Sequence, residues 1–311
     1  MSILIKNGRV LNPSENLDSV MDILIDKGVI VKKASHIENE ANQIIDAKGC
    51  YVMPGLIDLH VHFRDPGLTY KEDIETGSRA AAKGGFTTVC CMPNTKPVVD
   101  SPETVKYIID KGKAVGLTNV LPVGAVTKNM AGVEITDVEG LKAAGICAIS
   151  EDGKSVMNSG VYRKAMKNAK KADIPVLAHC EDINLVEGGV INLGDKSKEL
   201  GVKGISNAVE DVIALRDILL AKETGAKLHL CHCSTKDSVE MVRRAKEEGV
   251  KVTAEVCPHH FSMCSDDITS NDANFKMNPP LRTREDMEAL IKGLSDDIIC
   301  LLYTSPSPRD S

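Results

Sequence analysis

The chain has 311 residues, of which 42% are hydrophobic, and carries a formal net charge of -6 at pH 7. This length allows one large domain and a small one, and the charge gives no reason to expect binding to nucleic acid or to a membrane. The first residues lack the basic start and apolar core of a signal peptide. Ten cysteines without a secretory signal indicate reduced thiols, so we expect a cytoplasmic protein.

Residues 3–54 contain short β-like segments without helical periodicity. They are separated by turn-forming pairs such as Lys27-Gly28, and they cover 4–10, 21–25, 29–32 and 43–45. This pattern predicts a small antiparallel sheet. The apolar run from Tyr51 to Ile57 predicts a buried strand.

From residue 55 onward, apolar strands alternate with amphipathic helices. Strands are predicted at 56–62, 87–92, 120–126, 146–150, 175–180, 228–232, 251–256 and 297–300. Helices are predicted at 72–82, 161–172, 208–223, 236–248 and 284–294. Eight strands with helices between them predict an α/β fold of the (β/α)8 TIM-like barrel kind, with functional groups at the carboxyl ends of the strands. An open doubly wound sheet is the alternative, but it gives no reason for polar residues at so many strand ends.

The first predicted barrel strand ends in a His-x-His pair. Side chains alternate along a strand, so His60 and His62 point to the same side, where both imidazoles can reach one metal ion. Barrel closure brings other strand ends to the same place, and these carry Asp152, His179 and His232. Four histidines and one aspartate suffice for two metal ions that share a carboxylate.

Other thiols and imidazoles near these strand ends offer alternative ligands. Cys231 and the next cysteine flank His232 and suggest a Cys-His-Cys cluster, but on a strand they face away from His232, so we expect them to pack in the core. His229 is expected on the opposite strand face from His232, in a structural role. His259 and His260 follow the seventh strand, where they can support the metal ligands from behind.

Short motifs stand at the strand ends in chain order. They are DLHVHFRDPG at 58–67, MPNT at 92–95, SEDG at 150–153, AHCE at 178–181, HCST at 232–235, PHHF at 258–261 and NPPLR at 278–282. Together they resemble the bacterial dihydroorotases of the amidohydrolase superfamily, of the type with Asp where many relatives carry a carboxylated Lys. The resemblance extends over residues 3–300.

The resemblance implies a metal-dependent hydrolase barrel with two Zn²⁺ ions per subunit. His60 and His62 match the ligands of the more buried zinc, His179 and His232 match those of the second zinc, and Asp152 matches the bridging carboxylate. Zinc in such a site activates water and polarises an amide carbonyl. The implied reaction is the zinc-dependent, reversible cyclisation of N-carbamoyl-L-aspartate to L-dihydroorotate in pyrimidine (UMP) biosynthesis.

The resemblance also implies the groups that hold the substrate. Arg64 and Asn94 match residues that bind the substrate carboxylate, and Asn278 matches a residue that contacts the pyrimidine ring. A planar guanidinium suits this task because it grips a carboxylate through two hydrogen bonds and stays charged.

The sequence departs from the family pattern after Cys300. The family continues with a Thr-Asp-His-Ala-Pro-His-like segment whose Asp transfers the proton, whereas this chain continues with LLYTSPSPRDS. We therefore expect three regions: 1–54 as the N-terminal part of a composite β-sandwich, 55–300 as a barrel lacking its last helix, and 301–311 as a non-native tail. The catalytic Asp is missing from this sequence, so we expect the chain as given to be inactive.

Two other functions compete with dihydroorotase. A hydantoinase or allantoinase would generally use a carboxylated Lys where this chain has Asp152, and Arg64 suits an acidic substrate better. An inactive partner of aspartate transcarbamoylase would typically have lost metal ligands, but all five matching residues are present. The expected partners are a small-molecule substrate and either a second copy in a homodimer or aspartate transcarbamoylase, with no nucleic acid and no membrane.

Overall fold

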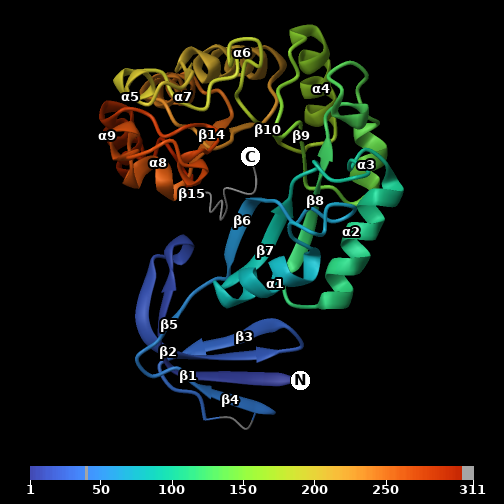
Figure 1. The fold of residues 1–311 in the computed structure, drawn as a ribbon. Coiled ribbons are helices and arrows are strands. Elements are labelled where there is room, and N and C mark those ends of the chain that lie inside the picture. Colours follow the sequence, from blue (N-terminus) through green and yellow to red (C-terminus); the bar gives the residue numbers. More distant parts are fainter. Residues whose placement is uncertain (39–40, 303–311) are drawn as a thin grey trace. The chain divides into compact units, whose positions relative to one another are not determined.

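The computed structural model describes residues 1–38 and 41–302 (Figure 1). The chain divides into two compact units, Met1–Leu56 and Ile57–Ser311. Within the described residues, no helix combines the length and the apolar character that crossing a lipid bilayer requires.

The first unit is a five-stranded sheet of β1 (Ser2–Asn12), β2 (Leu17–Asp26), β3 (Val29–Ala34), β4 (Gln43–Asp46) and β5 (Tyr51–Val52), with a 3-10 turn at Pro13–Glu15. The strands lie where the pattern predicts them, but the expectation of an antiparallel sheet is wrong in part. β1 pairs antiparallel with β2 and parallel with both β4 and β5. The β2–β3 hairpin turns at Lys27 and Gly28, whose φ angles of 49° and 79° are those that a two-residue hairpin turn requires.

The core of this first sheet is small. Leu4, Leu24 and Ile37 form its buried apolar cluster. Asp22 is 1% exposed and accepts the backbone N–H groups of Asn7 and Ile37, at 2.9 Å each, which fixes the chain that follows β3. The predicted burial of the run 51–57 is wrong, because most of its apolar side chains are exposed, Tyr51 by 61%.

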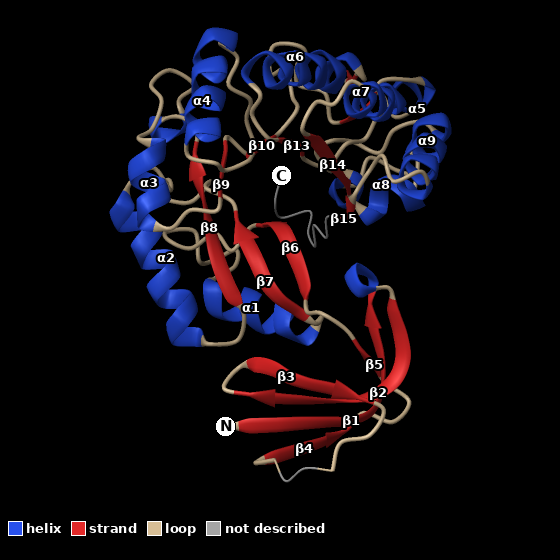
Figure 2. Cartoon of the chain, turned by 180° about the vertical axis from the view of Figure 1, so that it is seen from behind, coloured by secondary structure: helices blue, strands red, loops and turns tan. Residues whose placement is uncertain are grey.

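The second unit contains an eight-stranded sheet whose strands are neighbours in chain order, as a (β/α)8 barrel requires. They are β6 (Leu56–Val61), β7 (Phe86–Cys91), β8 (Asn119–Ala125), β9 (Ala148–Ser150), β10 (Val176–Ala178), β13 (Leu228–Leu230), β14 (Val252–Val256) and β15 (Leu301–Leu302). The short strands β11 (Ile191–Asn192) and β12 (Gly204–Ile205) pair with each other. Figure 2 shows the strands of the large sheet in an arc with the helices on its outer side.

Helices follow the strands. They are α1 (Ile74–Lys83), α2 (Pro102–Val115), α3 (Val138–Ala144), α4 (Ser159–Lys171), α5 (Asp195–Glu199), α6 (Ala208–Thr224), α7 (Lys236–Glu247), α8 (Pro258–Ser262) and α9 (Arg284–Ser295), with 3-10 turns at Lys128–Met130, Ser265–Asp267 and Ala273–Phe275. The five predicted helices all form. Their starts are fixed by caps such as Asp73, Thr235 and Thr283, whose side chains accept a backbone N–H of the first turn.

The eighth strand lies later than predicted. Residues 297–300 were expected to form it, but Ile298 and Ile299 donate their backbone N–H groups to Gly293 and complete the end of α9. Asp297 has a φ of 57°, which belongs to a turn and not to a strand. Leu301 and Leu302 form β15 against Glu255 and Val256 of β14. Counted from Cys300, the position of the family's Asp is held here by Leu302. The rest of the expected non-native tail, 303–311, lies outside the described residues.

Two apolar layers hold this unit together. Val89, Val176, Leu228 and Ala254 point outward from the sheet into the main core beneath the helices. On its inner side the sheet carries a smaller cluster of Cys90, Met92, Val123, Ala148, Leu177 and Cys231. This inner cluster lies below the strand ends that carry the polar residues, so it forms the floor of the candidate site.

Candidate metal centre

Four strand ends place the predicted ligands around one carboxylate. His60 lies in β6, His62 directly after it, and Asp152, His179 and His232 follow β9, β10 and β13. His60 Nε2 lies 3.2 Å from Asp152 Oδ1, and His62 Nε2 lies 3.4 Å from Asp152 Oδ2. The two histidines thus reach opposite oxygens of the same carboxylate from one strand end, as the alternation of side chains predicts.

The other two histidines approach the carboxylate from the ends of β10 and β13. His179 Nδ1 lies 2.8 Å from His232 Nε2, and these atoms lie 3.7 and 4.0 Å from Asp152 Oδ1. The five residues form two overlapping groups, His60 with His62 and Asp152, and Asp152 with His179 and His232. In each group the possible ligand atoms lie within 4.8 Å of one another. Imidazole and carboxylate donors at this spacing fit two zinc ions that share Asp152.

The protonation states suit metal ligation. Burial by itself would raise the pKa of Asp152, but the imidazoles of His60 and His62 hold that pKa well below its ordinary value, so the carboxylate is ionised. Burial, together with the neighbouring His179, lowers the pKa of His232 well below its ordinary value. His232 is therefore a neutral imidazole with a lone pair to offer.

Glu255 in β14 orients the first group, and sequence reasoning missed it. Its carboxylate is buried and accepts the Nδ1–H of His60 at 2.7 Å and the backbone N–H of His232 at 3.1 Å. Burial favours the neutral acid, but His60 and His229 hold the pKa of Glu255 below its ordinary value. The available signal was a glutamate inside the apolar run Val252–Val256, because a buried charge needs partners.

Glu181 has the same task in the second group. Glu181 Oε2 lies 3.1 Å from His179 Nε2, so that the other ring nitrogen, Nδ1, faces His232 and Asp152. Carboxylates that hold the outer nitrogen of a ligating histidine fix its tautomer and ring orientation. Glu181 lies in the AHCE motif, so its position was visible in the sequence while its role was not.

Known proteins match this chain along its length. A family model described as Dihydro-orotase-like matches residues 49–238. Curated dihydroorotases of Ruminiclostridium cellulolyticum and Geobacter sulfurreducens are each 48% identical to the chain, over 309 and 310 residues. The alignments cover 99% of this chain and 72% and 73% of those proteins. The chain belongs to the dihydroorotase family.

Solved structures support the fold of this dihydroorotase family member. L-hydantoinase (dihydropyrimidinase) from Arthrobacter aurescens superposes with a TM-score of 0.81 at 24% identity, over 97% of this chain and 68% of that one. D-hydantoinase (dihydropyrimidinase) from a Thermus species gives a TM-score of 0.76 at 28% identity, with the same coverage of both chains. The predicted α/β fold with a TIM-like barrel is confirmed. The composite β-sandwich and the bounds 1–54, 55–300 and 301–311 stay predictions.

Two orientations predicted for β13 are wrong in this dihydroorotase family member. His229 lies on the inner side of the sheet, where its Nε2 is 3.0 Å from Glu255 Oε2 and its Nδ1 is 2.8 Å from Thr253 Oγ1. Cys231 packs in the inner cluster, as expected, but its sulfur lies within ligand distance of His60 and Glu255. Strand alternation fails because β13 ends at Leu230 and His232 has a φ of 35°. That turn aims His232 at the centre although it follows Cys231 directly.

The residues matched to substrate binding lie beside the centre. Asn94 Oδ1 is 3.1 Å from His62 Nδ1, and Asn94 Nδ2 donates to Asp152 Oδ2 at 3.1 Å. Asn278 is exposed and donates its amide N–H to Glu181 Oε1 at 3.1 Å. Arg64 follows β6 in a left-handed conformation with a φ of 55°, and it is 7% exposed. Their roles toward substrate stay predictions.

Proposed function

We propose that this protein is a zinc-dependent dihydroorotase, which interconverts N-carbamoyl-L-aspartate and L-dihydroorotate in pyrimidine biosynthesis. The observation that carries the proposal is the placement of one ionised carboxylate, Asp152, between two pairs of histidines from four strand ends. The family membership of the chain supports the same reaction.

The proposal assigns the five residues to two ions. His60, His62 and Asp152 hold one zinc, and Asp152, His179 and His232 hold the other. When bound, zinc supplies Lewis acidity, which activates water and polarises an amide carbonyl. Glu255 and Glu181 keep the imidazoles of His60 and His179 in the orientation and tautomer that this donor set needs.

The substrate is bound by the chain's own polar groups in this proposal. Arg64 and Asn94 hold the substrate carboxylate, and Asn278 contacts the pyrimidine ring. Arg64 is 7% exposed, and its planar guanidinium suits a carboxylate, which it can grip through two hydrogen bonds. Carbamoyl aspartate carries such a carboxylate, whereas a hydantoin ring does not.

In this proposal, proton transfer depends on the Asp that the family carries after Cys300 and that this sequence lacks at that position. The reaction needs a group that protonates the departing nitrogen in one direction and takes the proton in the other. Glu255 is engaged with three N–H donors and is therefore a poor substitute. We propose that the chain of residues 1–311, tested by itself, binds metal and does not turn over. A cytoplasmic location and a homodimer or a complex with aspartate transcarbamoylase belong to the same proposal.

The experiment is a measurement of metal content and turnover on two chains. One is the present chain, and the other carries the segment Thr-Asp-His-Ala-Pro-His after Cys300 together with the remainder of a curated relative. We expect both to bind zinc and only the longer one to hydrolyse dihydroorotate. Hydantoin hydrolysis without dihydroorotate hydrolysis would replace the proposed substrate. Loss of zinc binding in both chains would refute the metal assignment.

A further inference from the structure

A second cluster of metal-binding side chains lies at the end of β14, apart from the five residues around Asp152. Cys257, His259 and His260 each offer one ligand atom, and these atoms lie within 4.8 Å of one another. Cys257 and His260 are almost fully buried, and His259 is half-buried. The proposed dihydroorotase reaction uses none of the three.

The local backbone explains why these side chains meet. Cys257 precedes α8, and the backbone N–H of His260 donates to the Cys257 carbonyl oxygen at 3.0 Å. This single helical turn places residues three apart on one side of the helix. The rings of His259 and His260 are also close, with centroids 4.3 Å apart.

His260 has the hydrogen-bond pattern of a metal ligand. Its Nε2–H donates to the Pro279 carbonyl oxygen at 2.9 Å, so Nδ1 is the unprotonated nitrogen. Nδ1 is buried, and among the residues that the structure describes it has no hydrogen-bond partner. Ligating histidines commonly donate their other N–H to a carbonyl in this way, and a buried lone pair without a partner is unfavourable.

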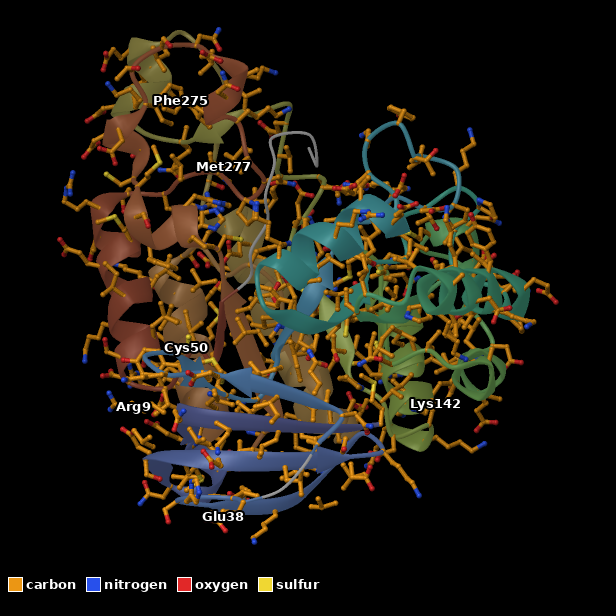
Figure 3. All side chains as sticks on the ribbon, turned by 90° about the horizontal axis from the view of Figure 1, so that it is seen from below. Arg9, Glu38, Cys50, Lys142, Phe275 and Met277 are labelled. Carbon is orange, nitrogen blue, oxygen red and sulfur yellow. The ribbon has the colours of Figure 1, made fainter. Side chains whose placement is uncertain are left out.

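We propose that Cys257, His259 and His260 bind one further Zn²⁺ ion. One thiolate and two imidazoles are a preferred donor set for zinc, and a water completes the tetrahedral arrangement. The bound ion would fix the ring of His260, whose Nε2–H already donates to the Pro279 carbonyl oxygen, and would so support the contact between α8 and the segment that starts at Asn278. Phe275 and Met277, which Figure 3 labels, precede this segment and pack against Ile191, Ile268 and Leu281. The site does not depend on the proposed dihydroorotase function.

Cobalt substitution tests the site directly. Cobalt bound to a thiolate absorbs in the near ultraviolet, whereas the centre around Asp152 has only nitrogen and oxygen donors. The full chain with Cys50→Ser and Cys300→Ser, which removes its two exposed thiols, is titrated with Co²⁺. We expect the thiolate band in this chain and its loss in Cys257→Ser. In that variant, Co²⁺ should bind to the remaining ligands His259 and His260 at least about tenfold more weakly than to the parent site.

Three variants separate the competing explanations. Cys231→Ser removes the buried thiol that lies within ligand distance of His60 and Glu255. This variant should keep the band. His62→Asn should lose cobalt from the centre around Asp152 and also keep the band, so the two sites fail independently. His259→Asn, at a half-buried position, should weaken the band without disturbing the fold. A band that is absent from the parent chain, persists in Cys257→Ser or disappears in Cys231→Ser would overturn the proposal.

Discussion

Replacing Glu255 by Gln tests whether this residue controls the metal centre. The carboxylate accepts N–H groups from His60, from His229 and from the backbone of His232, at 2.7, 3.0 and 3.1 Å. Gln has nearly the same volume, so the inner side of the sheet stays filled. It keeps one acceptor oxygen and loses the negative charge that makes the His60 imidazole a stronger base.

The expected magnitude follows from these contacts. A hydrogen bond to a charged group contributes about 1.5–3 kcal/mol, and Glu255→Gln converts such bonds to neutral ones. His229 can turn its N–H toward Thr253, to which its Nδ1 is already bonded at 2.8 Å, so the loss concentrates at His60. We expect zinc at the His60, His62 and Asp152 group to bind about 10- to 100-fold more weakly, which corresponds to about 1.4–2.8 kcal/mol.

The assay is competition with a chelator on the purified full chain. Glu181→Gln is the matched control, because it removes the same kind of carboxylate from His179 in the other group. Each variant should weaken one ion selectively and leave the other close to its original affinity. Zinc affinity within about twofold of the parent in Glu255→Gln, with an intact fold, would refute the orienting role. Equal weakening of both ions would show a general loss of structure.

Three further predictions concern other parts of the chain. Burial raises the pKa of Asp217 to about 7 in the folded protein. The folded state therefore holds a proton that the unfolded state loses above about pH 4, and stability falls as the pH rises from about 4 to 7. Between about pH 4 and 7, Asp217→Asn should lose this fall in the free energy of unfolding, measured with urea, which amounts to up to about 4 kcal/mol. A pH dependence equal to that of the parent chain would contradict the assignment. Gly67→Ala should destabilise the fold by at least about 2 kcal/mol more than Gly49→Ala in the same assay, because an added Cβ meets the Lys96 carbonyl oxygen at 1.8 Å in the first case and nothing within 4 Å in the second. Asp152→Asn should lose both zinc ions of the centre in elemental analysis, since an amide cannot supply the shared charge, and retention of both would refute the bridging role.

Local sequence patterns were enough to predict much of the candidate site. His60 and His62 meet the same carboxylate because alternation along one strand is a local property, readable from two positions in the sequence. The strands and the five predicted helices were likewise placed to within a few residues, since their periodicity and caps are local, whereas α2 and α3 were not predicted. The exceptions lie at element ends. The eighth strand is displaced because the turn after α9 uses residues whose apolar pattern is typical of a strand.

The parts that the sequence did not reveal depend on contacts between distant residues. Glu255 supports His60 across 195 positions, and Asn278 reaches Glu181 across 97. His229 and Cys231 were assigned the wrong orientation relative to His232 because one backbone torsion, the φ of 35° at His232, interrupts the strand.

The sequence by itself determined the family, the order of the strands and of the five predicted helices, and the five residues that we propose as ligands of two metal ions. The ability of these residues to ligate a metal follows from their type and spacing, which can be recognised without knowing the rest of the fold. Only the tertiary structure decided which carboxylates orient those ligands, and that Cys257 and two histidines meet in a separate cluster. A hydrogen bond or a metal site needs atoms within a few ångströms, and for residues far apart in the chain that distance is set by how the strands pack into one sheet.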